Sequence, residues 1–224
     1  MSGSCSATLN RDFTRRAVRE VTKAGVEQYL VLGSGLPDGG SVQPFSHEVA
    51  PHARVVYNDI DPMVESHRRA FLPGDSENTG IVLADLGDTS AVLGAAETAR
   101  LIDLSKPIGV ISTAVFHLIP GDISETVSAY VDVMAPPGSY LIVSACVAEG
   151  VSPEMIEVCT KLFPSFEPRS REELSAWCAG LKVVAPGVEM VQRWRPEKAY
   201  EPPLDMRVLC VVARKPGGRA TRRI

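Results

Sequence analysis

The sequence lacks any long apolar run. No uninterrupted stretch approaches the roughly 18 residues that a membrane-spanning helix needs, and residues 1–16 lack the apolar segment behind a basic start that marks a secretory signal. Cysteine is also scarce: the five cysteines are scattered and form no CxxC pair, which argues against a disulfide framework and against a zinc site. These absences predict a soluble, cytoplasmic protein that holds no metal.

Neither sign of charge dominates. The chain carries 27 acidic and 23 basic residues, a net charge of -4, so it has no electrostatic footprint for nucleic acid or an anionic membrane. We therefore expect a small-molecule partner, with no nucleic acid and no membrane. The basic cluster at the C-terminus comprises Arg214, Lys215, Arg219, Arg222 and Arg223. We expect residues 214–224 to form a disordered tail and residues 1–213 to form one domain, because no linker-like stretch divides them.

Short apolar runs alternate with amphipathic stretches along most of the chain. The expected strands cover residues 28–32, 54–57, 80–84, 108–112 and 139–144. Stretches with helical spacing cover residues 10–24, 41–50, 62–72, 90–99 and 124–134. Because almost wholly apolar runs are typical of parallel strands buried on both faces, this alternation predicts an α/β domain, a mostly parallel sheet with helices on both faces.

The C-terminal third follows a different pattern. Residues 154–163 have helical spacing, and a capping-box sequence at Ser170 opens a further helix through Ala179. Residues 188–194 and 206–213 have strand character, and a loop with no strong helix joins them. Such strands commonly pair as an antiparallel hairpin, so we expect a sheet of seven strands that ends in a C-terminal antiparallel hairpin.

Ligands of open parallel sheets bind beyond the carboxyl ends of the strands. The first expected strand ends in the turn Gly33-Ser34-Gly35, followed by Leu36, Pro37 and Asp38. A dinucleotide site would have a third glycine where Asp38 stands, and a negative charge there would oppose a pyrophosphate. The turn therefore favours an adenosyl cofactor without phosphates, bound by Gly33, Ser34, Gly35 and Pro37. A purely structural turn is an equal alternative.

Acids follow the second and third expected strands. Asp59 ends the second strand, where a carboxylate can accept hydrogen bonds from both ribose hydroxyls, and Ile60 would lie against the adenine face. Asp85 follows the third strand and can accept from the adenine amino group, with Leu86 beside it. The structural alternatives are a helix cap for Asp59 and a loop cap for Asp85, and Asp61 is interpreted chiefly as a helix N-cap.

The fourth expected strand ends at Ser112 and Thr113, which we assign to the cofactor site, and His117 follows. A neutral imidazole can remove a proton from an attacking nucleophile, so His117 is the candidate catalytic base. A packed histidine, or one that only touches the cofactor, fits the pattern equally well. The other three histidines show no metal-ligand spacing.

These residues resemble the S-adenosyl methyltransferase family common in actinobacteria, over about residues 10–196. The motifs that carry the resemblance are Asn10-Arg11-x-Phe13, Arg15-Arg16, Gly33-x-Gly35-Leu36-Pro37, Asp59 with Asp61-Pro62, Asp85-Leu86, His117-x-Ile119-Pro120, Arg169-Ser170-x-Glu172-Glu173 and Arg193-Trp194-x-Pro196. The resemblance implies a single Rossmann-like class I methyltransferase domain, S-adenosyl-L-methionine as cofactor and S-adenosyl-L-homocysteine as product. It also implies that Arg11 or Arg16 approaches the methionine carboxylate.

The chain departs from the family pattern at Val31, where members carry an acid that helps to hold the methionine ammonium. It also starts later than typical members, so we expect a shorter lid or one completed by the partner in a homodimer. The leading hypothesis is methyl transfer to a small acceptor, aromatic or a secondary metabolite. The alternatives are a cofactor-binding regulator or pseudoenzyme, motivated by Val31, and a methyltransferase-fold enzyme with non-methyl chemistry such as cyclisation.

Overall fold

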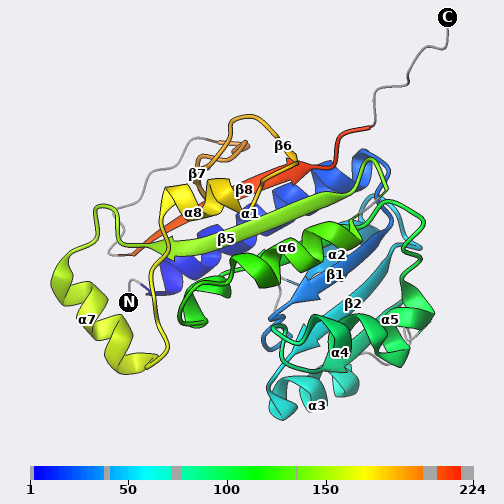
Figure 1. Cartoon of the computed structure of the whole chain (residues 1–224), viewed down its shortest axis with the longest axis horizontal. Coiled ribbons are helices and arrows are strands. Elements are labelled where there is room, and N and C mark those ends of the chain that lie inside the picture. The colour runs from blue at the N-terminus through cyan, green and yellow to red at the C-terminus, as the bar shows by residue number, and fades with distance from the viewer. Residues whose placement is uncertain (1–2, 38–40, 72–76, 135, 199–205, 218–224) are drawn as a thin grey trace, which may run out of the picture.

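A sheet forms the middle layer of the computed structural model, which describes residues 3–37, 41–71, 77–134, 136–198 and 206–217. Its eight strands within these ranges run in the order β3-β2-β1-β4-β5-β8-β6, and β7 pairs with β8 (Figure 1). They are β1 (Gln28–Leu32), β2 (Arg54–Asp59), β3 (Thr79–Leu83), β4 (Gly109–Thr113), β5 (Tyr140–Val147), β6 (Lys182–Val183), β7 (Glu189–Met190) and β8 (Arg207–Arg214).

The first five strands are parallel, and β1 lies between β2 and β4. In the register, Leu30 of β1 lies opposite Val56 of β2 and Val110 of β4, and all three side chains are buried. The chain builds outward from β1 to β2 and β3, then returns to the other side of β1 for β4. The topological switch point, where ligands bind in this kind of sheet, therefore lies at the carboxyl ends of β1 and β4.

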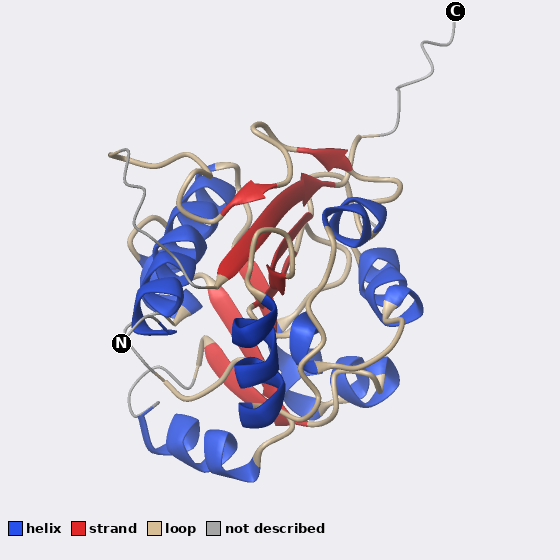
Figure 2. Cartoon of the chain, turned by 90° about the vertical axis from the view of Figure 1, so that its left-hand side faces the viewer, coloured by secondary structure: helices blue, strands red, loops and turns tan. Residues whose placement is uncertain are grey.

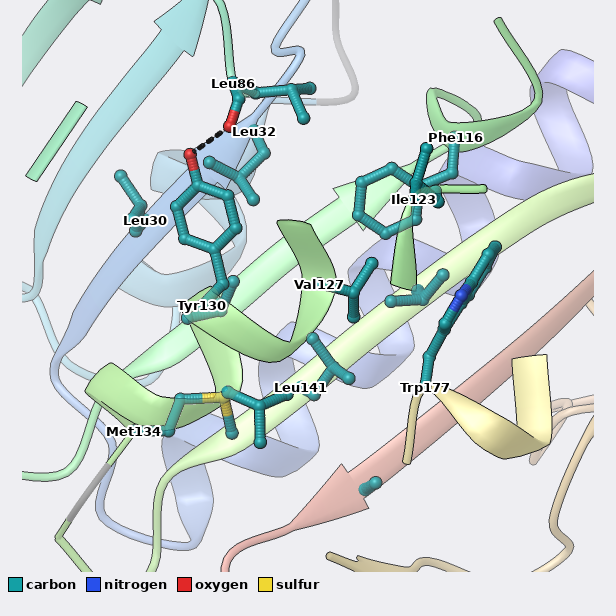
Figure 3. Close-up of a cluster of buried hydrophobic side chains, with 14 of the residues drawn as sticks. Leu30, Leu32, Leu86, Phe116, Ile123, Val127, Tyr130, Met134, Leu141 and Trp177 are labelled. Atoms are coloured by element: carbon teal, nitrogen blue, oxygen red, sulfur yellow. Dashed lines mark hydrogen bonds between the residues drawn. The ribbon is translucent and has the colours of Figure 1, made fainter. Parts of the chain in front are cut away.

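Helices cover both faces of the sheet (Figure 2). They are α1 (Gly3–Lys23), α2 (Val42–His47), α3 (Pro62–Phe71), α4 (Thr89–Gly94), α5 (Ala96–Leu101), α6 (Ser124–Val133), α7 (Pro153–Leu162) and α8 (Arg171–Ala176), with a short 3-10 turn, η1 (Phe116–Leu118). One apolar cluster joins the sheet to α1 and α2, and a second joins its other face to α4, α5, α6 and α8. Tyr130, Phe116 and Trp177 are the aromatic members of the second cluster, with Val127 between Tyr130 and the other two (Figure 3).

The predicted mostly parallel α/β fold is confirmed, with two corrections at its C-terminal end. The strand expected over residues 188–194 is only the two-residue β7, and the unpredicted β6 raises the strand count above seven. β7 does pair antiparallel with β8, but the long partner of β8 is β5, from Tyr140 opposite Arg214 to Val147 opposite Arg207. Val191 and Trp194 are buried because they pack against α1. The rings of Phe13 and Trp194 meet edge to face, with their centroids 5.5 Å apart.

Two further differences concern helix bounds. The helix expected over residues 90–99 is broken into α4 and α5 at Ala95, whose backbone is extended (φ -61°, ψ 143°). The N-terminal helix begins at Gly3, earlier than expected. Arg214 belongs to β8, and because residues 218–224 lie outside the described ranges, the disordered tail stays a prediction. Within the described residues, no helix combines the length and apolarity needed to span a bilayer.

Candidate active site

The turn after β1 is built from two glycines in the left-handed region. Gly33 has φ +64° and Gly35 has φ +60°, conformations that side chains with a Cβ adopt at a cost. A Cβ on Gly33 would also lie 2.5 Å from Val115 Cγ1. The predicted glycine turn therefore brings the backbone close to the loop after β4, at the switch point of the sheet.

Two charged side chains fix this turn from neighbouring elements. Asp59, at the end of β2, accepts a hydrogen bond from the Gly35 N–H through Oδ2 at 2.8 Å. Arg68 of α3 donates from Nε to the Gly35 carbonyl at 3.0 Å and from Nη2 to the Ser34 carbonyl at 2.8 Å. Its guanidinium lies 4.0 Å from the centre of the Tyr57 ring, a cation–π distance. The turn is held in a defined shape by groups of both signs.

Arg68 was missed in the sequence. It is only 4% exposed, which is rare for an arginine, and it satisfies carbonyls that no sequence motif marks. The available signal is its spacing: Arg68 stands four residues after the buried Val64 on α3, so the two side chains share the inward face of the helix.

Beyond this turn lies a cavity of about 520 Å³, which we call the cofactor cavity. Six predicted cofactor residues line it: Gly33, Gly35, Asp59, Ile60, Asp85 and Leu86. The size is typical of small-molecule sites. These residues come from the ends of β1, β2 and β3, and the structure brings them together as the parallel-strand rule predicts.

The acids of the cofactor cavity are shaped by local hydrogen bonds. Asp59 accepts from the Asp61 N–H through Oδ1 at 3.1 Å, while Asp61 caps α3 by accepting from the Met63 N–H at 2.8 Å. Asp85 is exposed and accepts from the Gly87 N–H at 2.8 Å. A carboxylate offers about four lone-pair sites, so Asp59 and Asp85 each keep sites for ligand donors.

The backbone of Leu86 is held by a hydrogen bond from α6. The hydroxyl of Tyr130, on α6, donates to the Leu86 carbonyl at 2.7 Å (Figure 3). Burial raises the pKa of Tyr130, so the phenol stays protonated and remains a donor. Ile60 also lines the cavity, and its side chain is 65% exposed.

The remaining predicted cofactor residues are not among the described residues that line the cofactor cavity. Ser34 and Ser112 each have a buried hydroxyl with no hydrogen-bond partner among the described residues, as does the Oδ1 of Asn58 on the cavity wall. Thr113 ends β4 and is half-buried. Pro37 is half-buried after the turn, without a place among the described residues that line the cavity.

The two arginines implied by the resemblance are not brought to the cofactor cavity. Arg16 donates from Nε to the Trp194 carbonyl at 3.0 Å and from Nη2 to the Val191 carbonyl at 2.7 Å. Burial lowers its pKa, with Asp12 opposing this effect. Arg11, on the same helix, is half-buried, and it too has no place among the described residues of the cavity wall.

A second cavity, of about 600 Å³, adjoins the first, and we call it the apolar cavity. Asn10, His117 and Cys146 line it, together with a row of side chains from α7. Ala114 and Leu118 line both cavities, so the two spaces meet at the loop after β4. Ala114 has φ +59°, and strained backbone of this kind is concentrated at functional sites.

His117 is buried in the wall of the apolar cavity, with 6% of its surface exposed. Desolvation, helped by the positive charge of Arg169, lowers its pKa from 6.5 to about 4. Its Nδ1 accepts the Cys146 N–H at 3.2 Å, so the proton of the neutral ring lies on Nε2. A ring in this state donates a hydrogen bond from Nε2, which does not favour the predicted role as proton acceptor.

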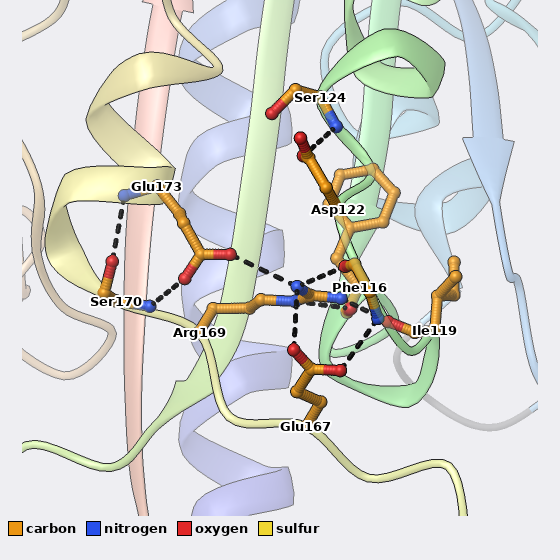
Figure 4. A network of polar contacts seen from close by, with 9 residues as sticks. Phe116, Ile119, Asp122, Ser124, Glu167, Arg169, Ser170 and Glu173 are labelled. Atoms are coloured by element: carbon orange, nitrogen blue, oxygen red, sulfur yellow. Dashed lines mark hydrogen bonds and ion pairs between the residues drawn. The ribbon is translucent and has the colours of Figure 1, made fainter.

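The loop that carries His117 is clamped by Arg169 (Figure 4), a second residue that sequence reasoning missed. The guanidinium donates to the carbonyls of Phe116 at 3.0 Å and Gly121 at 2.9 Å, and also to that of Ile119. It is 3% exposed and forms an ion pair with Glu173 at 3.2 Å. The expected capping box at Ser170 and Glu173 is present, so the same carboxylate caps α8 and binds the clamp.

The segment around Arg169 runs beside β5 as well. The Arg169 N–H donates to the Cys146 carbonyl at 2.9 Å, and Val147 and Arg169 form an isolated parallel bridge. The Glu167 N–H donates to the His117 carbonyl at 2.8 Å. The wall between the two cavities is thus tied to β5 and to the start of α8.

The site fits an S-adenosyl cofactor. Its glycine turn leaves no room for a Cβ at Gly33, two carboxylates that can accept hydrogen bonds line the cavity, and the buried oxygens of Ser34 and Asn58 have no hydrogen-bond partner among the described residues. Within the described residues, no group of three or more His, Cys, Asp and Glu side chains is arranged to hold a metal ion. The absence of a metal stays a prediction.

Fold and site together define a class I S-adenosylmethionine-dependent methyltransferase. A family model described as S-adenosyl methyltransferase matches residues 2–216, and the chain belongs to that family. No curated protein matches the chain.

Solved structures agree with this assignment. A candidate methyltransferase from Thermobifida fusca is 34% identical, with a TM-score of 0.88, over 95% of this chain and 82% of that one. A DUF574 family protein from Streptomyces avermitilis is 31% identical, with a TM-score of 0.86, over 93% and 83%. A candidate sarcosine dimethylglycine methyltransferase from Galdieria sulphuraria, 13% identical with a TM-score of 0.62 over 91% and 85%, shares the fold.

Proposed function

We propose that this methyltransferase acts on a small-molecule acceptor, aromatic or a secondary metabolite, bound in the apolar cavity. The observation that carries the proposal is the shared wall: Ala114 and Leu118 line both cavities. Two ligands held on either side of one strained backbone segment can meet at that segment, as a direct transfer requires. Net charge of -4 supports a small molecule over nucleic acid as the partner.

The chain's residues act mainly by positioning. When bound, S-adenosylmethionine supplies a sulfonium methyl group to a nucleophile. With the cofactor bound, Asp59 would accept hydrogen bonds from the ribose hydroxyls, Asp85 would accept one from the adenine amino group, and Ile60 would cover the adenine face. The glycine turn would let the cofactor approach the backbone, and holding two reactants in line accounts for much of the rate of such a transfer.

His117 touches the acceptor in this proposal. With Nδ1 engaged by the Cys146 N–H at 3.2 Å, the ring donates from Nε2 to an oxygen or nitrogen of the acceptor and orients it. The proton that the acceptor loses therefore leaves to solvent water, to which the cavity is partly open, and not to this imidazole. A His117→Gln variant can still donate, whereas His117→Phe cannot, so the first should keep more of the transfer rate.

Parallel calorimetric titrations with S-adenosylmethionine, S-adenosylhomocysteine and NAD test the cofactor assignment. We expect micromolar binding of the two adenosyl compounds and none of NAD. A panel of hydroxylated and amino-substituted naphthalenes is then incubated with the protein and S-adenosylmethionine, and formation of S-adenosylhomocysteine is measured. Turnover of a member of the panel supports the proposal. Absence of binding for both S-adenosylmethionine and S-adenosylhomocysteine overturns it.

A regulator is the second candidate, and Val31 favours it. This side chain is 6% exposed in β1, between Tyr57 and Ile111 of the adjacent strands, so its position offers no carboxylate to the methionine ammonium. If the protein is a regulator, it should bind S-adenosylmethionine and S-adenosylhomocysteine and methylate no acceptor.

We further propose that the protein works in the cytoplasm. Sedimentation of the pure protein tests whether it forms a homodimer.

A further inference from the structure

Helix α7 contributes no buried residue, although it stands beside the active site. In Figure 1 it lies apart from the helical layers that cover the sheet. Large apolar side chains at its C-terminal end are solvent-exposed: Val158 by 47%, Leu162 by 68% and Phe163 by 52%. Exposed apolar side chains grouped in this way mark a binding surface.

The apolar side chains of α7 point to one place. Met155, Val158, Cys159 and Leu162 are spaced by three and four residues, so they lie on a single helix face. All four line the apolar cavity. We call these four residues the α7 stripe. Burying leucine and valine side chains away from water against an apolar group is favourable. An apolar ligand in the cavity would bury the α7 stripe in this way.

Polar groups of the cavity lie beside the wall shared with the cofactor cavity. Ser144 Oγ donates to Asn10 Oδ1 at 2.6 Å and accepts the Ala114 N–H at 3.0 Å. Asn10 is thereby placed two hydrogen bonds from Ala114, and His117 lies on the same cavity wall. Among the described residues that line the cavity, none carries a full charge at neutral pH: the histidine is neutral, and burial raises the pKa of Cys146 to about 12.

We propose that the acceptor is an uncharged amphiphile whose apolar body lies on the α7 stripe and whose hydrogen-bond-accepting head lies beside Asn10 and His117. The proposal rests on the proposed function and deepens it. The head is at the end of the cavity where Ala114 and Leu118 meet the cofactor cavity, so the reacting atom belongs to the head. The α7 stripe then selects acceptors by the size of the apolar body.

Continuity argues for a small ligand as the occupant. The α7 stripe lines a partly open cavity of about 600 Å³ that shares the lining residues Ala114 and Leu118 with the cofactor cavity, and a volume of this size suits a drug-sized molecule. A second copy of the chain seated on α7 is the alternative occupant. Hydrogen exchange and sedimentation separate these two occupants.

The test uses 1-naphthol as probe and 1-naphthyl phosphate as its charged counterpart, each titrated by calorimetry into the full chain saturated with S-adenosylhomocysteine. We expect 1-naphthol to bind at least about tenfold more tightly. Leu162→Gln should weaken 1-naphthol by about tenfold through lost apolar contact. Leu104→Gln, at a side chain 43% exposed in the loop between α5 and β4, is the matched control and should leave the affinity for 1-naphthol unchanged.

Equal or tighter binding of the phosphate overturns the proposal, as does an unchanged affinity in Leu162→Gln. A dimer in sedimentation with α7 amides protected from exchange, and no protection by 1-naphthol, overturns it in favour of a second copy. Failure of S-adenosylhomocysteine to bind would remove the proposed function itself. Binding of S-adenosylhomocysteine without 1-naphthol would remove only this inference.

Discussion

Asp59 is the residue whose loss should most clearly separate cofactor binding from folding. Its carboxylate takes the Gly35 N–H at 2.8 Å and the Asp61 N–H at 3.1 Å, which leaves about two of its four lone-pair sites for ribose hydroxyls. Hydrogen bonds to a charged group are worth about 1.5–3 kcal/mol. Asp59→Ala should therefore raise the Kd of S-adenosylhomocysteine by about a hundredfold, and Asp59→Asn by less, because one oxygen remains.

Calorimetric titration of S-adenosylhomocysteine measures the effect, with Asp61→Ala as the matched control. Asp61 caps α3 through the Met63 N–H at 2.8 Å, so its loss should cost about 1 kcal/mol of stability and leave the Kd within about twofold. The role of Asp59 in cofactor binding is refuted when Asp59→Ala binds the ligand as tightly as the wild type, or when both variants weaken binding equally.

Three other sites give predictions of the same kind. Gly33→Ala puts a Cβ 2.5 Å from a neighbouring methyl group and should abolish measurable S-adenosylhomocysteine binding. Gly25→Ala, with positive φ but open space, should only lower the unfolding temperature. The folded pKa of His117, about 4, lies below the unfolded value near 6.5, so the unfolded chain binds the proton first as pH falls. Urea titrations should show up to about 3 kcal/mol of stability lost between these two values, and His117→Gln should lack that loss. Arg169→Gln leaves buried carbonyls without a donor and should destabilise by about 3–5 kcal/mol, with faster hydrogen exchange after β4, whereas the exposed Arg15→Gln should change stability by at most about 0.5 kcal/mol. Similar unfolding curves for both arginine variants would contradict the role of the clamp.

Six of the predicted cofactor residues line one cavity because they stand at strand ends. Gly33, Asp59 and Asp85 are far apart in the chain, but parallel strands bring their carboxyl ends to one edge. Local chemistry and topology are then sufficient, since no long side chain has to find its partner. The same rule placed His117 at the site without fixing its protonated nitrogen, which depends on the Cys146 N–H.

The clamps could not be predicted in this way. Arg68 and Arg169 bind main-chain carbonyls, and a carbonyl carries no sequence identity. Arg16 shows the reverse failure: its motif matches the family, but its guanidinium binds the carbonyls of Val191 and Trp194. The prediction of a strand over residues 188–194 was wrong for a related reason. Tertiary packing of this segment against α1 gives the same apolar pattern in the sequence as a buried strand.

The bridge between Val147 and Arg169 makes the segment 148–168 a cassette. Its two ends are held together by the sheet whatever lies between them, and each doubling in the length of such a loop costs only about 0.6 kcal/mol. Because α7 adds nothing to either apolar cluster, substitutions on this helix are almost free of folding constraint. Evolution or design can therefore change α7, and with it the fit to the acceptor, while Ser165 and Glu167 keep their places beside the cofactor cavity and the His117 loop.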